Sequence, residues 1–189
     1  MHFVCFYYAN KYIEPDVTFT LYISTATGGP AIELLNSNIF AGYIGIGVFF
    51  GNEDSRNISL NIKETRDIKV TNQVCELLGC IKALETIVTT QNIGKNELII
   101  HTDSMYVINS ITSWAKNWKK NNWRRLDNKP IQNLELIKKL YYLSKNLKVG
   151  YKHIKAHTNP PDEDSDDYFE WYGNYMADKL AVQGSLKNN

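Results

Sequence analysis

The spacing of apolar residues changes along this 189-residue chain, and the order of those changes limits the folds open to it. Apolar and other residues alternate in 17–23 (VTFTLYI) and again at Ile58, Leu60 and Ile62, as in strands with one buried face. The run 42–51 (GYIGIGVFFG) predicts a strand between them, whose glycines permit another backbone to approach closely. Short turns join the three segments, which predicts an antiparallel meander.

Helical spacing then alternates with short apolar runs. One helix is predicted by a stripe of apolar residues spaced by three or four positions: Leu77, Ile81, Leu84 and Val88. Further strands are expected at 97–101 and 149–154, and further helices at 134–147 and after Gly173. The order βββαβαβα predicts an α/β fold with a five-stranded mixed sheet and helices on both faces. We expect one domain at 16–189, preceded by an N-terminal arm or extra strand at 1–15.

The charges of the chain are segregated, although the net charge is only +1. The segment 113–125 (SWAKNWKKNNWRR) carries five cations and no acid, whereas 162–170 (DEDSDDYFE) carries six acids and no base. Two local fields of opposite sign follow. The acidic run lies within 159–172, which is predicted to be a solvated loop.

The cysteines and the apolar runs bear on the compartment. Cys5, Cys75 and Cys80 are an odd number without metal-ligand spacing, which is typical of reduced thiols. No apolar run approaches the roughly 20 residues of a membrane span, so no membrane partner is expected. Residues 1–15 lack the basic leader and small-residue cleavage site of a secretory signal. We therefore expect an intracellular protein (cytoplasm, nucleus or viral factory) that is not secreted.

Three carboxylates fall where chemistry is possible. Asp103 ends a predicted buried strand, and ligand crevices form at such ends in open α/β sheets. Glu76 lies in the first turn of a predicted helix, and Asp178 shares a helix face with Asn174. Each also has a simpler structural explanation, because Asp103 or Ser104 can cap a helix and Glu76 can answer a helix dipole.

Four segments, TNQVCELLGCIKALE, HTDSMYVINSITSWAKNWKKNNWRR, IKAHTN and GNYMADKLA, resemble ribonuclease H type 1 of the cellular kind. The resemblance runs from about Val17 to Gly184. It implies the ribonuclease H-like fold with a basic protrusion, and hydrolysis of the RNA strand of RNA–DNA hybrids. It also implies two Mg²⁺ ions, with Mn²⁺ as a substitute, held by four carboxylates. Glu76, Asp103 and Asp178 match three of the four.

The fourth carboxylate of the family is missing from this sequence. The family has an Asp at the end of its first strand, in a Thr-Asp-Gly-Ser signature, and Ser24 stands at that position here. Two Mg²⁺ ions repel each other, so a neutral hydroxyl is a poor replacement for a bridging anion. Asp16 lies at the wrong end of the strand, and Glu33 in the following loop is the remaining substitute. Weak or absent cleavage is expected unless another acid replaces the lost one.

The resemblance also implies roles for residues outside the metal site. His157 matches a loop histidine that moves protons during product release, although an exposed loop histidine is the simpler explanation. Asn72 and Gln73 match residues that contact 2′-hydroxyls of RNA, as both amides can donate and accept hydrogen bonds; a polar turn is the alternative. The residues matched to contacts with the DNA strand are Lys69, Thr71, Tyr106, Trp118, Lys119, Lys120, Trp123 and Asn133.

The basic segment has a structural alternative of its own. It can be an amphipathic helix with core tryptophans and solvated lysines. The helix and the DNA-binding protrusion are compatible if Trp114 is buried while Trp118 and Trp123 face the substrate. Three functions follow for the chain: a hybrid endonuclease acting as a monomer, a catalytically inactive module that binds hybrids or double-stranded RNA, or a structural domain of a replication complex that docks through 1–15.

Overall fold

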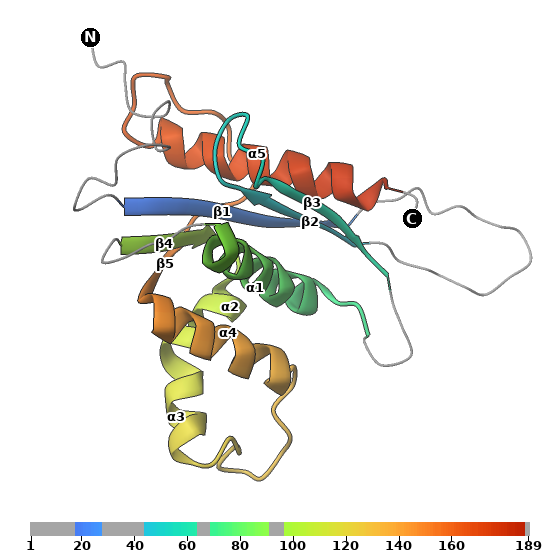
Figure 1. Ribbon diagram of the computed structural model, residues 1–189, viewed down its shortest axis with the longest axis vertical. Helices are drawn as coiled ribbons and strands as arrows, with labels where there is room; N and C mark the ends of the chain where they lie inside the picture. The colour runs from blue at the N-terminus through green and yellow to red at the C-terminus, as the bar shows by residue number, and fades with distance from the viewer. Residues whose placement is uncertain (1–17, 28–43, 64–68, 91–96, 188–189) are drawn as a thin grey trace, which may run out of the picture.

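The computed structural model describes residues 18–27, 44–63, 69–90 and 97–187 (Figure 1). The predicted arm at 1–15 lies outside the described residues, as do Cys5, Asp16 and Glu33. Among the described residues, no helix combines the length and apolar character that crossing a bilayer requires. Cys75 and Cys80 are free and buried, in agreement with the expected thiols.

A single sheet of five strands forms the centre of the fold. In chain order its strands are β1 (Thr18–Thr27), β2 (Ile44–Phe49), β3 (Ile58–Ile62), β4 (Glu97–Thr102) and β5 (Val149–His153). Across the sheet the order is β3-β2-β1-β4-β5. The first three strands pair antiparallel, as the alternation predicted, and β4 and β5 add in parallel to β1. The predicted mixed sheet is therefore confirmed.

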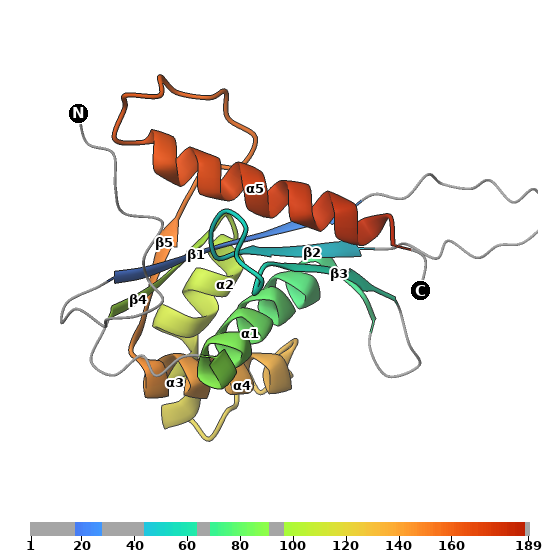
Figure 2. The same cartoon turned by 45° about the horizontal axis from the view of Figure 1, so that its top comes forward.

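The helices connect these strands. In chain order they are α1 (Asn72–Thr90), α2 (Met105–Asn109), the π-helical turn η1 (Ser110–Trp114), α3 (Ala115–Lys120), α4 (Leu134–Leu147) and α5 (Tyr168–Ser185). One face of the sheet is covered by α5, whereas α1 lies against the other face with α4 beside it (Figures 1 and 2). The helix α3 and the turns after it project away from the sheet, so the predicted protrusion exists.

The apolar stripe of α1 packs on the sheet, with one exception to the prediction. Leu77, Ile81 and Leu84 are fully buried against strands β1 and β2. Val88 is 54% exposed, and Ile87 is buried in its place. The prediction for Val88 was wrong because the position four residues after Leu84 has rotated out of the interface in the last turn of the helix.

The predicted close approach at the glycines of β2 is confirmed. A Cβ atom on Gly45 would lie 1.8 Å from the carbonyl oxygen of Ala181, and one on Gly47 would lie 1.9 Å from that of Ala177. Both alanines belong to α5 and are fully buried. Helix α5 therefore rests directly on the backbone of β2, which no side chain larger than hydrogen would allow.

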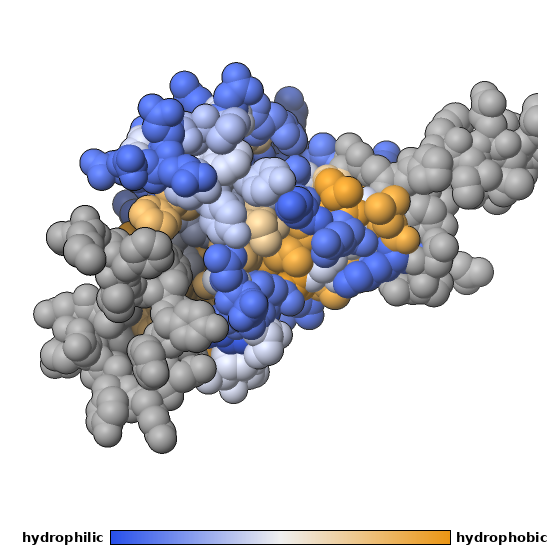
Figure 3. Space-filling view, turned by 90° about the horizontal axis from the view of Figure 1, so that it is seen from above, coloured by the Kyte–Doolittle hydropathy of each residue, from blue (hydrophilic) through white to orange (hydrophobic). Residues whose placement is uncertain are grey.

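Helix α5 begins at Tyr168, five residues before Gly173, so the predicted start of the last helix was wrong. Gly173 lies inside the helix, at a point where a Cβ would be 2.3 Å from the Tyr22 ring of β1, so only glycine fits there. The glycine signals close packing of helix on sheet, not a helix boundary. As a result, 168–172 is helical, and the solvated loop predicted for 159–172 ends at Asp167. Seen from the side of α5, the surface is mainly hydrophilic, with smaller apolar areas (Figure 3).

Candidate active site

The parallel pairing of β1 and β4 brings Ser24 close to Asp103. Ile23 pairs with Thr102, so the next residue of each strand lies at the same edge of the sheet. Ser24 is 6% exposed, and Asp103 directly follows β4 and is half-buried. This is the level at which β4 ends, whereas β1 continues beyond Ser24 to Thr27; open α/β sheets place their ligands at such carboxyl ends of strands.

Helix α1 contributes Glu76 to this edge and α5 contributes Asp178, and each carboxylate accepts a hydrogen bond from a serine hydroxyl. The Ser104 hydroxyl donates a hydrogen bond to Glu76 Oε2 and also accepts one from the Val107 N–H at 3.2 Å, as the N-cap of α2. Ser104 therefore caps α2, the role proposed for either Asp103 or Ser104. On the other side, the Ser24 hydroxyl donates to Asp178 Oδ1 at 3.4 Å. Each helix carboxylate is thus held by a hydroxyl from the sheet side of the site.

The charges of the carboxylates act on one another. Burial raises the pKa of Glu76, a hydrogen bond from Ser104 opposes this rise, and the nearby charge of Asp103 adds to it. Burial also raises the pKa of Asp103; its own backbone N–H and the nearby histidines, His157 among them, lower it, and the Asp178 charge raises it further. Asp103 thus interacts with both other carboxylates, and the three sequence-predicted residues lie in one connected site.

No ready-made metal cluster is present in the described part of the chain, where no three His, Cys, Asp or Glu side chains stand together closely enough to hold an ion. Glu76 and Asp178 instead direct an oxygen toward the hydroxyls of Ser104 and Ser24. The donor set nevertheless suits a hard divalent cation, because it consists of half-buried carboxylates, and the charge of a neighbouring carboxylate raises the pKa of both Glu76 and Asp103.

We expect Asp103→Asn to stabilise the metal-free protein at pH 7 by about 0.5–1 kcal/mol, a value reduced because water still reaches the half-buried site. The folded state raises the pKa of Asp103 above its ordinary 3.8, so ionisation there weakens folding. The stabilisation should be complete above the raised pKa and disappear below about pH 3, where both states are protonated. Urea unfolding of both proteins between pH 3 and 8 measures it.

Saturating Mg²⁺ provides the control for this experiment. Mg²⁺ should stabilise the native protein more than Asp103→Asn, because binding to the folded state alone raises the free energy of unfolding. Equal stability of the two metal-free proteins at pH 7 would contradict the assigned electrostatics of Asp103.

A small pocket of about 50 Å³ lies beside Asp178. Its lining comes from β1, the loop after β5 and α5: Ser24, Ala156, His157, Thr158, Trp171, Asn174, Tyr175 and Asp178. The predicted loop histidine, His157, is therefore at the site, exposed and with a left-handed φ of 53°. Asn174 is 8% exposed, and its buried Oδ1 has no hydrogen-bond partner among the residues that the structure describes.

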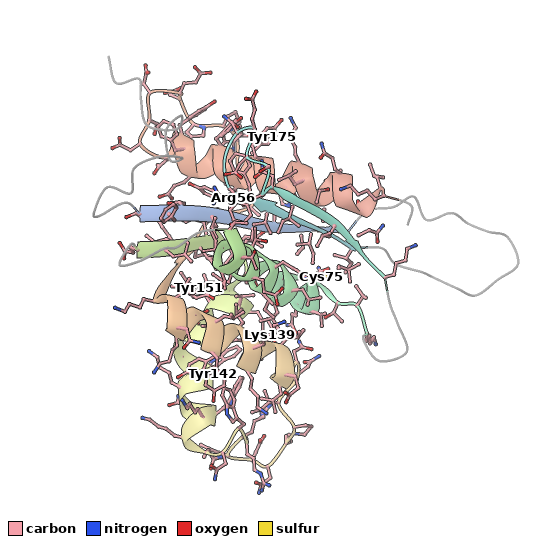
Figure 4. All side chains as sticks on the ribbon, in the orientation of Figure 1. Arg56, Cys75, Lys139, Tyr142, Tyr151 and Tyr175 are labelled. Atoms are coloured by element: carbon pink, nitrogen blue, oxygen red, sulfur yellow. The ribbon has the colours of Figure 1, made fainter. Side chains whose placement is uncertain are left out.

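Four of the pocket residues were missed by the sequence interpretation: Ala156, Thr158, Trp171 and Tyr175. Trp171 and Tyr175 are four residues apart on α5, and their rings stack at 5.1 Å with an angle of 11°. Tyr175 lies on the side of the sheet opposite to Tyr142 of α4 (Figure 4). The i, i+4 spacing of two aromatic residues just before Asp178 was the available signal, but Trp171 had been assigned to a loop.

Five of the residues matched to RNA and DNA contacts lie at the start of α1 or directly before α4: Lys69, Thr71, Asn72, Gln73 and Asn133. Asn72 is exposed and Gln73 half-buried in the first turn of α1, preceded by the exposed Lys69. The Thr71 hydroxyl accepts a hydrogen bond from the Val74 N–H at 3.3 Å, so it also caps α1. Asn133, the residue preceding α4, is bonded to Tyr106: its side-chain amide donates to the Tyr106 hydroxyl at 3.1 Å.

The tryptophans of the protrusion are arranged differently from the prediction. Trp114 is 39% exposed, whereas Trp118 and Trp123 are partly buried against the core. The predicted burial of Trp114 was therefore wrong. Trp123 instead turns back onto α4, where it contacts Tyr141 and Tyr142 at 5.8 and 6.1 Å between ring centroids. The lysines of α3 are exposed.

Lys119 and Lys120 end α3 and are exposed. The Lys119 Nζ lies 5.7 and 5.2 Å from the rings of Tyr141 and Tyr142, which holds this cation on an aromatic surface. The protrusion therefore presents cations backed by aromatic packing, an arrangement suited to phosphate contacts.

A mixed sheet in the order β3-β2-β1-β4-β5, with Asp103 directly after β4 and beside Ser24 of β1, defines the ribonuclease H-like class of folds. A sequence model of the RNase H family matches residues 35–186, which is most of the chain. The chain belongs to the RNase H family. The matched range begins after β1, the strand that carries Ser24.

Curated relatives agree with this assignment. The chain is 36% identical over 141 residues to ribonuclease H of Schizosaccharomyces pombe, covering 75% of this chain and 46% of that protein. It is 34% identical over 137 residues to a probable ribonuclease H of Acanthamoeba polyphaga mimivirus, covering 72% and 56%. The chain thus spans about half the length of the curated relatives it matches.

Solved structures share the fold at lower sequence identity. LC9-RNase H1, a type 1 RNase H with the type 2 active-site motif, has a TM-score of 0.62 at 20% identity, covering 91% of this chain and 74% of that one. The PFV RNase H domain has a TM-score of 0.58 at 22% identity, covering 88% and 93%. These likenesses concern the fold.

Proposed function

We propose that the protein hydrolyses the RNA strand of RNA–DNA hybrids, as a monomer, with divalent metal held by Glu76, Asp103 and Asp178. The observation that carries this proposal is that Glu76 and Asp178 are bonded to Ser104 and Ser24, the two residues on either side of Asp103 at one edge of the sheet, in a chain of the RNase H family. Carboxylate oxygens are the ligands that Mg²⁺ prefers, and Mn²⁺ accepts the same set.

The metal, when bound, supplies an activated water and stabilises the leaving oxygen of the phosphodiester. The chain's own residues have three tasks. Asp178 and Glu76 must exchange their hydroxyl partners, Ser24 and Ser104, for the cation. Asp103, whose charge acts with those of both other carboxylates, would hold the ion together with them. His157, exposed beside Asp178, can take up or release a proton as the cleaved strand leaves.

Within this proposal Ser24 weakens the activity. The hydroxyl is neutral and donates its proton to Asp178, so it opposes the release of that carboxylate to a cation and adds no negative charge of its own. The same bond supports the second candidate function, a catalytically inactive module that binds hybrids or double-stranded RNA. In that case Ser24 keeps Asp178 in a hydrogen bond without metal.

Cleavage of a hybrid labelled on its RNA strand tests the proposal. We expect slow cleavage by the native chain in Mg²⁺ or Mn²⁺, and none by Asp103→Asn, which removes one ligand charge and retains the shape of the side chain. Hybrid binding with no cleavage in either metal would favour the inactive module. Failure to bind hybrid at all would reject both functions.

We expect Asn72→Ala combined with Gln73→Ala to reduce the preference for hybrid over DNA duplex by about tenfold, because each lost hydrogen bond to a 2′-hydroxyl contributes about 0.5–1.5 kcal/mol. Among the described residues, neither side chain makes a hydrogen bond, so the substitutions should leave the fold intact. Competition binding with the two duplexes at one salt concentration measures the preference. Lys120→Ala is the control, since a phosphate contact should weaken both duplexes alike.

A further inference from the structure

The first turns of α5 are fixed to the sheet at several points. The Tyr172 hydroxyl donates to Asn52 Oδ1 at 2.9 Å, in the turn between β2 and β3. Glu170 forms an ion pair with Lys152 of β5. Gly173 packs on the Tyr22 ring of β1. The start of α5 is therefore a rigid platform at the edge of the active site.

Trp171 extends from this platform to the loop that carries His157. Its indole N–H donates to the Thr158 carbonyl oxygen at 3.0 Å, while its ring stacks on Tyr175. Among the described residues, this bond is the one that ties the backbone of 155–161 to the rest of the fold. Before that segment, the Ile154 N–H donates to the Thr102 carbonyl oxygen at 3.1 Å, so the loop is held at two places.

Thr158 directly follows His157, and both residues line the pocket that contains Asp178. A carbonyl bonded one residue away limits how far the histidine can move, and the left-handed backbone of His157 (φ 53°) restricts its direction. We propose that Trp171 is a positioning residue, which holds His157 over the pocket beside Asp178. The structural part of this inference concerns the loop alone, and its catalytic part rests on the proposed hybrid cleavage.

Backbone ¹⁵N relaxation of the metal-free protein tests the structural part. We expect Trp171→Phe, which retains an aromatic ring for Tyr175 but lacks the N–H, to lower the order parameters of 156–159 from about 0.85 to below about 0.6. Tyr168→Phe is the matched control, since it removes a hydroxyl from a ring that lies 5.8 Å from Trp171 and 6.1 Å from Tyr172, and it leaves the indole N–H in place. Unchanged order parameters in Trp171→Phe would overturn the proposal.

Turnover of a labelled hybrid tests the catalytic part. In the Ser24→Asp background, where product release can limit turnover, Trp171→Phe should reduce kcat about fivefold, the effect of one lost hydrogen bond. KM should fall in the same proportion, and the single-turnover rate should not change. His157→Ala should show the same pattern, and adding Trp171→Phe to it should have no further effect. Multiplied effects, or an equal fall in the single-turnover rate, would show that Trp171 does not act through His157.

The two parts fail differently. If neither the native chain nor Ser24→Asp cleaves hybrid, the proposed function has failed, and the relaxation experiment still decides whether Trp171 restrains the loop. If cleavage occurs and the loop is equally ordered in Trp171→Phe, the positioning role has failed and the proposed function stands.

Discussion

Ser24→Asp is expected to raise the rate of hybrid cleavage in Mg²⁺ by about a thousandfold, which corresponds to about 4 kcal/mol of barrier. The substitution places an anion at the edge of the sheet shared with Asp103, and it removes the hydroxyl that donates to Asp178. Two cations about 4 Å apart repel each other, and a carboxylate between them offsets that repulsion as a hydroxyl cannot. Initial rates with labelled hybrid, at saturating Mg²⁺ and with equal enzyme, measure the change.

Ser24→Asn is the matched control, because it has the shape of Asp without the charge. A comparable gain from Ser24→Asn would mean that the release of Asp178, not the new charge, limits the native chain. Titration of Mn²⁺ by calorimetry adds a readout that does not depend on turnover, and it should show tighter binding in Ser24→Asp alone. Fast cleavage by the native chain that Glu33→Gln abolishes would show that the fourth ligand was wrongly assigned.

The fold was predictable because its signals are local. Alternation at Ile58, Leu60 and Ile62 and the helical stripe through Leu77 reflect which face of each element meets the core, and such periodicity survives without tertiary information. The glycines at 45 and 47 also predicted a close contact. The partner in that contact, α5, was not predictable from the strand itself, since nothing in its sequence specifies which element approaches.

The start of α5 shows why the remainder was missed. Gly173 resembles a boundary in the sequence, whereas in the fold it is the place where the Tyr22 ring meets the helix, 151 positions away in the chain. The acidic run before it favoured a loop, and Trp171 was therefore placed outside the helix. Only the tertiary contact with β1 distinguishes a glycine that packs a helix from one that ends it.

The sequence indicated which residues are candidates for the site, but not the hydrogen bonds that connect them. Glu76, Asp103 and Asp178 were chosen through their motifs, and their separation along the chain gives no distance. The hydrogen bonds from Ser104 to Glu76 and from Ser24 to Asp178 depend on the placement of two helices over the sheet edge. A neutral residue at 24 was visible in the sequence, but its effect on Asp178 was visible only in the structure.

The contact between β2 and α5 leads to the largest expected change in stability. We expect Gly47→Ala to lower the free energy of unfolding by about 3 kcal/mol, since overpacking at a tight contact usually costs 1–3 kcal/mol and here the obstruction is backbone. The added Cβ would lie 1.9 Å from the Ala177 carbonyl oxygen and 2.5 Å from the Ala181 nitrogen, so α5 must move. For a chain of this size, the melting temperature should fall by roughly 6–12 °C.

Gly150→Ala on β5 is the matched control, because its added Cβ would meet Ile99 at 3.6 Å, an ordinary contact. That variant should be within about 0.5 kcal/mol of the native protein, as the alanine also reduces the entropy of the unfolded chain. Gly47 pairs with Ser24 across the β1–β2 ladder, and Ala177 precedes Asp178. The displacement of α5 in Gly47→Ala should therefore also weaken Mn²⁺ binding, measured by calorimetry below the melting transition. Equal thermal stability of the two variants would mean that α5 does not rest on the backbone of β2.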